Sequence, residues 1–439
     1  MTLNLRWVDL SQSDDLTEFS NLLIAQPTQQ SDVQAKVDHI IAQVRLRKDE
    51  ALLEFAREFD GVQANSAAAL EIDSSVIASS IDQIEADLRA ALEQAAARIR
   101  RFHEAQQQAV KQADFCLEDE FGSQFSQRTT AMQRVGIYVP GGKALYPSSV
   151  LMNGIPARVA GVKEIIMAVP LGQNQQVAPV VLAAAAIAGV DRVFTMGGAQ
   201  AIAAMAYGTP SIPKVDTIVG PGNVYVALAK RAVFGQCGID MIAGPSEILI
   251  LADRSLPVDS CIFDLFSQAE HDELAQAVII STDASYLDEI AKRLPRLLAS
   301  QPRRAIIEQS LLNRGALVLV KSWQQAIVLS NMMAPEHLEL AFEGAEAFAD
   351  QVEHAGSVFV GVHTTESFGD YCAGPNHVLP TSGSARFSSP LGVQDFQKRT
   401  AFTRCTAAGA SELGKLAAKL ARAEQLEAHA LAAESRISQ

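Results

Sequence analysis

From about Arg134 onward, short runs of β-branched residues alternate with helical runs, and this alternation limits the possible folds more than any other feature. Repeated strand-helix-strand units predict parallel sheets with helices packed on their faces. The expected strands lie at 135–139, 164–169, 192–196, 217–219 and 240–242 in a first series, and at 248–251, 278–280, 316–320, 337–340 and 357–360 in a second. The expected helices lie at 177–188, 199–207 and 224–234, and then near 257–272, 284–309 and 345–354. The sequence therefore predicts an α/β fold with two similar parallel-sheet lobes.

The segments outside these two series are expected to form helices and one long loop. Residues 31–59 and 74–102 carry apolar side chains at spacings of three and four, which predicts two long amphipathic helices. Residues 361–400 lack this periodicity and are rich in Gly, Ser, Thr, Pro and aromatic residues, which favours an ordered functional loop. Residues 407–435 are rich in Ala, Leu, Glu and Lys, so they are expected to form a helix or helix pair that is too small to fold alone.

Composition excludes several classes of protein. Hydrophobic residues make up 48% of the 439 residues and charged residues 20%, which excludes wholesale disorder. The net charge is −14 and no basic run occurs, so nucleic acid is not an expected partner. No run of 18 apolar residues and no signal-peptide pattern occur, so no membrane association is expected. Five widely spaced cysteines without a CxxC motif are typical of a reduced cytoplasmic protein.

Several scattered side chains are candidate metal ligands. Gln268 and His271 are three residues apart at the end of a predicted helix, so they share one face of it. Asp370 and His377 lie in the long loop, and His429 lies in the C-terminal helical segment. Two histidines with a carboxylate suit Zn²⁺, and an amide oxygen is a weaker ligand. Spacing alone leaves open the alternative that each histidine is an ordinary surface or capping residue.

The segment Ala334-Pro335-Glu336-His337 places a carboxyl group beside an imidazole where a loop enters a strand. Proline disfavours helix in the residue before it, which supports this placement of the segment. Histidine titrates near neutral pH, and burial raises the pKa of a glutamate toward the same range. The pair is therefore a candidate for general acid–base catalysis, although a simple polar strand entrance fits the pattern equally well.

Glycine-rich turns follow three of the expected strands, at 139–143, 196–200 and 220–223. Glycine lets a backbone approach a ligand closely, and a helix N-terminus attracts phosphate. The chain has no GxGxxG motif, however, and any tight turn between strand and helix needs glycine. Ser246 does not lie in a GxSxG motif, and no cysteine has an adjacent histidine, so neither residue type is favoured as a nucleophile.

Together these segments resemble the histidinol dehydrogenase family over essentially the whole chain. The similarity is strongest at Ile239–Glu247 and Gln268–His271. It extends to the motifs at 136–142, 197–200, 220–223, 334–337 and 374–377. The resemblance implies an enzyme of the last two steps of histidine biosynthesis. It would oxidise L-histidinol to L-histidine through L-histidinaldehyde with two NAD⁺ and a bound Zn²⁺.

The resemblance also implies roles for individual residues. It assigns the zinc ligands to Gln268, His271 and Asp370 of one subunit and His429 of the other, in an intertwined homodimer with shared active sites. His337 would be the base in both oxidations, and Glu336 would activate water for the second. The residues implied to contact substrate are Ser246, Gln268, His271, Glu336, His337, Asp370, His377, Glu424 and His429, and those implied to contact NAD⁺ are Tyr138, Gln200 and Asn223.

The strand–helix pattern and the family resemblance together predict how the chain is divided into domains. A helical N-terminal arm is expected at 1–27, and residues 28–137 with 244–381 are expected to form a lobe for substrate and zinc. Residues 138–243 are expected to form an incomplete Rossmann-like lobe for NAD⁺, and 382–439 an extension that completes the partner's site. Two alternatives stay open: a zinc-dependent hydrolase with Glu336 as general base, and a dimeric binding protein without catalysis.

Overall fold

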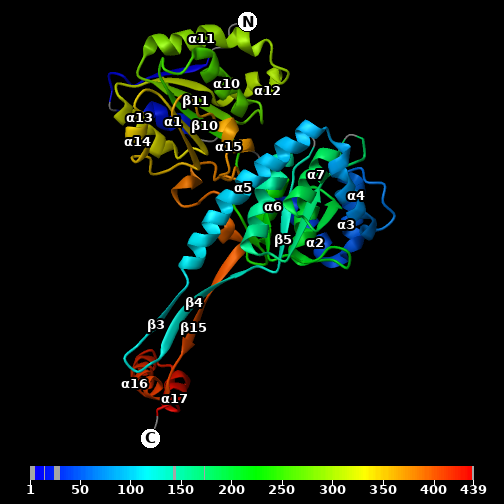
Figure 1. Cartoon of the computed structure of the whole chain (residues 1–439), viewed down its shortest axis with the longest axis vertical. Coiled ribbons are helices and arrows are strands. Elements are labelled where there is room, and N and C mark those ends of the chain that lie inside the picture. The colour runs from blue at the N-terminus through cyan, green and yellow to red at the C-terminus, as the bar shows by residue number, and fades with distance from the viewer. Residues whose placement is uncertain (1–4, 14, 24–29, 142–144, 173, 438–439) are drawn as a thin grey trace.

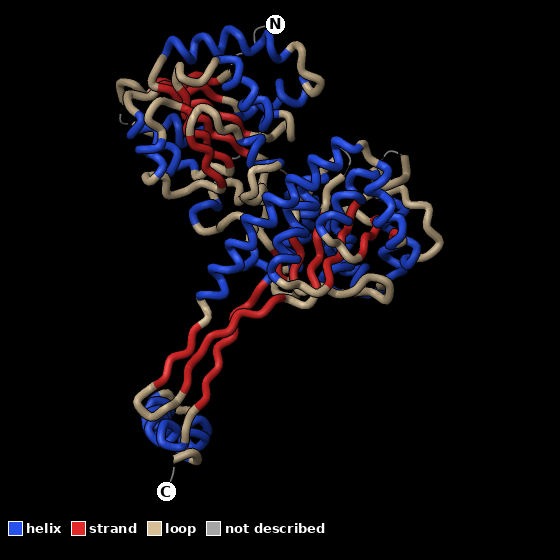
Figure 2. Tube along the Cα trace, in the orientation of Figure 1, coloured by secondary structure: helices blue, strands red, loops and turns tan. Residues whose placement is uncertain are grey.

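The computed structural model describes residues 5–13, 15–23, 30–141, 145–172 and 174–437. These residues form two α/β lobes, and a narrow arm leads from the lobes to the C-terminal helices (Figures 1 and 2). The expected α/β class with two parallel-sheet lobes is thereby confirmed. Each lobe is named here after the strand that begins its strand-helix-strand series, which gives the β5 lobe and the β10 lobe.

The β5 lobe is built on a six-stranded sheet with the order β2-β7-β6-β5-β8-β9. Its strands are β2 (Glu71–Ile72), β5 (Arg134–Tyr138), β6 (Glu164–Val169), β7 (Arg192–Thr195), β8 (Thr217–Val219) and β9 (Gly238–Ile239). All are parallel except β2, which runs antiparallel to β7. The expected strands of the first series are confirmed except at 240–242, because the last strand pairs at 238–239 instead.

Helices cover both faces of this sheet because successive strand residues point to opposite sides. In β6, Ile166 and Ala168 pack into one hydrophobic cluster, while Ile165 and Met167 pack into another. The helices of the first cluster are α2 (Gln30–Arg47), α3 (Asp49–Phe59), α8 (Gly198–Tyr207) and α9 (Val224–Val233). Those of the second are α4 (Ser74–Ser79), α5 (Ala86–Gln112), α6 (Pro147–Ala160) and α7 (Pro179–Ala188). A strand that is apolar on both faces thus has a core on each side.

The β10 lobe has a six-stranded, fully parallel sheet with the order β1-β12-β11-β10-β13-β14. Its strands are β1 (Arg6–Asp9), β10 (Glu247–Ala252), β11 (Gln276–Ser281), β12 (Ala316–Leu319), β13 (His337–Ala341) and β14 (Ser357–Val360). The helices α10 (Val258–Ala269), α11 (Ala284–Leu298) and α12 (Arg304–Arg314) cover one face, and α1 (Thr17–Leu23), α13 (Trp323–Met333) and α14 (Glu346–Ala349) the other. The expected strands of the second series are all present.

The two lobes share one strand order. Counted along the chain within each series, the strands lie in the order 3-2-1-4-5 in both sheets. The dinucleotide-binding fold adds a sixth strand after the fifth, and no such strand occurs among the described residues of either lobe. The description of each lobe as an incomplete Rossmann-like sheet is therefore confirmed.

The arm is a feature that the sequence pattern did not reveal. It consists of β3 (Phe115–Glu118), β4 (Gln124–Ala131) and β15 (Gln397–Arg404), which form an antiparallel sheet with β4 in the middle. Beyond it lie α16 (Ala407–Ala423) and α17 (Glu427–Glu434), which confirm the expected helix pair (Figure 1). Strands β4 and β15 are mostly polar, and β3 is exposed along its whole length, so none of the three shows the buried apolar alternation that marks a strand over a core.

The expected division of the chain differs from the observed one. The predicted division places residues 28–137 with the β10 lobe. In the structure, strands β2 and β5 and the described helices of this segment belong to the β5 lobe instead. The N-terminal segment contributes strand β1 to the β10 sheet in addition to helix α1. Both differences arise because sheet pairing joins segments that are distant in sequence.

Two expected long helices are interrupted. Lys48 has a positive φ of 56° and separates α2 from α3. The second is split into α4, a 3₁₀ turn (Ser80–Gln83) and α5. Likewise, the helix expected at 284–309 is divided into α11 and α12. Apolar periodicity continues through each interruption, so it does not reveal where the backbone changes direction.

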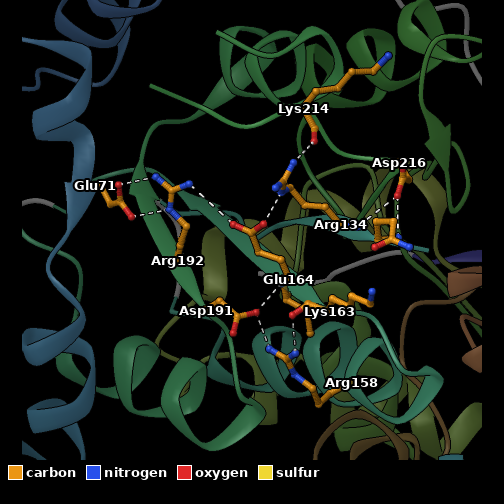
Figure 3. Close-up of polar contacts among 11 residues, drawn as sticks. Glu71, Arg134, Arg158, Lys163, Glu164, Asp191, Arg192, Lys214 and Asp216 are labelled. Atoms are coloured by element: carbon orange, nitrogen blue, oxygen red, sulfur yellow. Dashed lines mark hydrogen bonds and ion pairs between the residues drawn. The ribbon is translucent and has the colours of Figure 1, made fainter. Parts of the chain in front are cut away.

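Charged residues connect the amino ends of the strands in the β5 lobe (Figure 3). Arg134, the first residue of β5, pairs with Glu164, the first residue of β6, at 2.6 Å. Arg192, the first residue of β7, contacts Glu71 of β2 at 2.6 Å and Glu164 at 3.8 Å. The charges of this network lie at one edge of the sheet, and the glycine-rich turns lie at the opposite, carboxyl edge.

Among the described residues, no helix is both long and apolar enough to cross a membrane. All five cysteines are free thiols, as the lack of a disulfide pattern predicted.

Phe194 of β7 is completely buried and lies in the core of the β5 lobe. We expect Phe194→Ala to lower the free energy of unfolding by about 3–5 kcal/mol, because the lost contacts leave a cavity. Phe234→Ala is the matched control, because Phe234 is 69% exposed. Urea denaturation followed by circular dichroism measures both, and equal losses in the two variants would contradict this placement of the core.

Candidate active site

A cluster of buried polar side chains lies at the amino-terminal edge of the β10 sheet. Strands β10 and β13 are parallel neighbours, with Ile248 opposite His337. Glu336 and His337 therefore enter the sheet beside Glu247, the first residue of β10. Ala334 ends α13 with a left-handed backbone (φ 49°), and Pro335 follows it. The strand entrance expected from the Ala-Pro-Glu-His motif is confirmed, and both side chains are buried there.

The backbone of Glu247 orients Glu336 and His337. The carboxylate Oε2 of Glu336 accepts a hydrogen bond from the Glu247 amide at 2.8 Å. The imidazole Nδ1 of His337 lies 3.1 Å from the Glu247 carbonyl oxygen. Because a carbonyl only accepts, this contact requires a proton on Nδ1 and leaves the Nε2 lone pair of a neutral ring free. Nε2 is buried, makes no hydrogen bond among the described residues and lies 3.5 Å from Asp370 Oδ1.

Burial and charge shift the pKa of both members of the pair. Burial raises the pKa of Glu336 to about 8, against the attraction of His337 and the Glu247 amide. Burial alone would lower the pKa of His337, but the carboxyl groups of Glu366, Glu336 and Asp370 outweigh it and raise that pKa well above the usual value. Two titratable groups with displaced pKa values in one buried site are typical of proton-transfer chemistry.

Two of the metal-ligand candidates, His271 and Asp370, interact with His337, and Gln268 lies one helical turn before His271. Gln268 is at the end of α10, and its buried Oε1 has no hydrogen-bond partner among the described residues. His271 follows in the next turn, and Asp370 lies in α15 (Glu366–Tyr371). Burial lowers the pKa of His271, which favours its neutral, ligating form, while the nearby charge of Asp370 acts in the opposite direction. The end of α10 is linked to α15 by a hydrogen bond from Ser267 to Glu366.

Glu366 is a site residue that the sequence interpretation missed. Ligand atoms of His337, Glu366 and Asp370 all lie within 4.8 Å of one another. Burial raises the pKa of Glu366 to about 8. Glu366 and Asp370 are four residues apart and so share one face of α15, and this spacing was the available signal.

His377 lies at the border of the two lobes, and Ser246 lies at the start of the β10 sheet. His377 Nδ1 contacts the Asp370 carbonyl oxygen at 2.9 Å, and its Nε2 lies 3.4 Å from the Ser149 hydroxyl on α6 of the β5 lobe. Ser246 directly precedes β10, and its carbonyl accepts a hydrogen bond from the Gln276 amide at 2.9 Å. The polar cluster therefore faces the β5 lobe.

The residues Glu424 and His429 lie elsewhere. Glu424 follows α16, His429 is on α17, and both are exposed at the far end of the arm (Figure 1). Within this chain the arm separates them from the cluster in the β10 lobe.

The residues expected to contact NAD⁺ lie at the carboxyl edge of the β5 sheet, where ligands of this fold class bind. The Tyr138 hydroxyl, at the end of β5, accepts a hydrogen bond from the Gly198 amide at 3.1 Å. Gln200 lies in the first turn of α8. Asn223 caps α9 by accepting hydrogen bonds from the amides of Tyr225 and Val226.

The turn before Asn223 is tightly constrained. Gly220 has φ 109°, and a Cβ there would lie 2.2 Å from the Tyr138 carbonyl oxygen, so only glycine fits. Asp240 accepts from the Gly220 amide at 2.8 Å, and Lys230, which forms a buried ion pair with Asp240, donates to the Gly220 carbonyl at 2.9 Å. Of the first glycine-rich turn, residues 142 and 143 lie outside the described residues.

Comparison with known proteins places these observations in one family. The family model for histidinol dehydrogenase matches residues 24–437. Histidinol dehydrogenase of Pseudomonas savastanoi is 54% identical over 99% of this chain and 96% of its own length, and that of Dechloromonas aromatica is 53% identical over 97% of each. The crystal structure of histidinol dehydrogenase from Elizabethkingia anophelis superimposes with a TM-score of 0.90 at 35% identity, over 98% of both chains. The chain belongs to the histidinol dehydrogenase family, and thus to the oxidoreductases of histidine biosynthesis.

Proposed function

We propose that this chain oxidises L-histidinol to L-histidine through L-histidinaldehyde, using two NAD⁺ per histidine and one Zn²⁺ per subunit. The observation that carries the proposal is the buried pair of Glu336 and His337, in which the Glu247 backbone holds both side chains and Nε2 of His337 makes no hydrogen bond among the described residues. Family membership supplies the substrate. The cytoplasmic location stays a prediction from the sequence.

The residues of the β10 lobe fit a zinc ion. The Gln268 oxygen is buried without a hydrogen-bond partner among the described residues, as expected for an atom that binds a metal. We assign the zinc ligands to Gln268, His271 and Asp370 together with His429 of a second copy. A zinc ion held there would supply a positive charge that binds and orients the substrate.

His337 and Glu336 divide the proton chemistry. His337 Nε2 would take the proton of the substrate alcohol, and NAD⁺, when bound, would supply the hydride acceptor. Glu336, fixed by the Glu247 amide, then removes a proton from the water that attacks the aldehyde. His337 again takes a proton as the gem-diol loses the second hydride. A pKa of about 8 keeps Glu336 close to the range in which a general base is effective at neutral pH.

The remaining site residues bind and orient. We assign Ser246, His377 and Glu424 to substrate, in addition to the metal ligands and the acid–base pair, and Tyr138, Gln200 and Asn223 to NAD⁺. The N-termini of α8 and α9, where Gln200 and Asn223 lie, suit the phosphates of this cofactor.

We further propose a homodimer with shared sites. His429 and Glu424 lie too far along the arm to serve their own chain's cluster, so they would serve a partner's. Exposed leucines on the arm helices, among them Leu416 and Leu420, each 58% exposed, give this region an apolar surface that a partner would cover.

The reaction and its metal are tested together. We expect two NADH per histidine at 340 nm, with activity abolished by a chelator and restored by Zn²⁺, because the metal orients the substrate. The untreated sample is the control. A zinc-loaded protein that binds histidinol but yields no NADH would contradict the proposal and favour the alternative of a zinc-dependent hydrolase with Glu336 as base.

The division of roles is tested at the acid–base pair. We expect His337→Asn to slow both oxidations by about 10²- to 10⁴-fold, because it removes the base common to them. Glu336→Gln is expected to slow aldehyde oxidation by a similar factor and alcohol oxidation far less. Single-turnover measurements starting from histidinol or from histidinaldehyde separate the two steps. Equal losses in both steps for Glu336→Gln would contradict the division.

The shared site is tested by mixing subunits. We expect His429→Ala to lose zinc and activity, because it removes one of the two proposed histidine ligands. Random mixing of this variant with His337→Asn should restore about a quarter of wild-type activity, since half of the dimers are mixed and each has one intact site. Each variant alone is the control, and mixtures no more active than the variants would exclude a site shared between subunits.

A further inference from the structure

Asp60 is an acidic residue at the carboxyl edge of the β5 sheet to which the proposed function gives no role. It follows the last turn of α3 and is partly buried. Its Oδ2 accepts hydrogen bonds from the Gly197 amide at 3.0 Å and from the Gln200 side-chain nitrogen at 3.1 Å. Burial raises the pKa of Asp60, and both hydrogen bonds act against that shift by stabilising the carboxylate. The carboxylate is thus held in one orientation beside a residue assigned to NAD⁺.

The backbone around Asp60 is closely packed. A Cβ on Gly197 would lie 2.6 Å from Asp60 Oδ1 and 3.0 Å from Pro170. A Cβ on Gly141 would lie 2.7 Å from the same proline. Gly141, Pro170 and Gly197 follow β5, β6 and β7, so Asp60 lies at the carboxyl ends of the second and third strands of the series.

The position of Asp60 relates it to one end of the proposed cofactor. The chain passes from β9 directly to β10, and the Gly244 amide in this connection donates to Thr381 of the β10 lobe at 2.6 Å. The chain therefore enters the β10 lobe, which holds Glu336 and His337, from the β8–β9 side of the sheet. Asp60 lies on the opposite β6–β7 side, where the adenosine half of a dinucleotide rests in a sheet of this order.

In dinucleotide-binding sheets, an acidic residue near the end of the second strand accepts hydrogen bonds from the adenosine ribose. The residues after β6 include Pro170, Leu171 and Gly172, and none of these is acidic. Asp60 reaches the same edge from α3, a helix that precedes the sheet's first parallel strand in sequence. The Asp60 carboxylate therefore lies at the edge where an acidic residue is expected, although none of residues 170–172 is acidic.

We propose that Asp60 accepts hydrogen bonds from the adenosine ribose hydroxyls of NAD⁺ and excludes the 2′-phosphate of NADP⁺. This inference rests on the proposed use of NAD⁺. A carboxylate only accepts hydrogen bonds, which suits two hydroxyl groups. A phosphate monoester carries a charge of about −1.5 to −2, so a second anion fixed beside it disfavours binding.

Two variants test the role of the charge. Asp60→Asn keeps the size of the side chain and removes the charge, whereas Asp60→Glu keeps the charge. We expect Asp60→Asn to raise the ratio of kcat/KM for NADP⁺ to that for NAD⁺ by about tenfold or more, because a charged hydrogen-bond acceptor is lost. We expect Asp60→Glu to retain discrimination against NADP⁺.

Binding without turnover gives a second measurement. Titration calorimetry with ADP-ribose and with its 2′-phosphate should show the same change in preference in Asp60→Asn. Asp49→Asn is the matched control, because Asp49 lies at the start of the same helix and bonds Ser211 at 2.8 Å. This control should keep the wild-type preference in both measurements.

The outcomes distinguish this inference from the function on which it rests. Equal loss of affinity for both ligands in Asp60→Asn would overturn the inference and reduce Asp60 to a support for the Gly197 turn. Wild-type protein that binds neither ADP-ribose nor NAD⁺ would overturn the proposed function, and this inference with it.

Discussion

The candidate site depends on the parallel pairing of β10 with β13. This register brings Glu336 and His337 beside the backbone of Glu247, whose amide and carbonyl groups then bind the carboxylate and the imidazole. Backbone groups of a central strand cannot move independently of the sheet, so the orientation of both side chains is as rigid as the sheet itself. The left-handed Ala334 and the following Pro335 direct the chain into this register.

The two lobes have the same strand order but use opposite edges of their sheets. The β5 lobe presents its carboxyl edge, where Tyr138, Gln200 and Asn223 lie, in accord with the general rule for open α/β sheets. Its amino edge is occupied by the charged network around Glu164 (Figure 3). The β10 lobe instead presents its amino edge, with the buried acid–base pair. The contact between His377 and Ser149 joins these two edges, so the proposed cofactor and substrate residues face one another.

The sequence predicted the central strands well because each is a short β-branched run between helical segments, and this is a local property. It failed at the arm, where β4 and β15 are mostly polar and are separated by more than two hundred residues of the chain. It also misassigned residues 28–137, since which sheet a helix covers depends on packing. The sequence indicates Glu336, His337, Gln268, His271 and Asp370 through local motifs or family resemblance. It does not indicate Asp60, whose neighbours come from distant segments, and the spacing of Glu366 from Asp370 is only a weak signal.

The sequence by itself determined the fold class, the two series of strands and the family, because periodicity and ordered motifs are written along the chain. Only the tertiary structure decided which strands are neighbours, that Asp60 reaches the β5 sheet from α3, and that His429 lies far from the cluster in its own chain. It also decided the states of the titratable groups. The pKa values of Glu336 and His337 depend on burial and on charges from β10, β13 and α15, and these come together only when the sheets form.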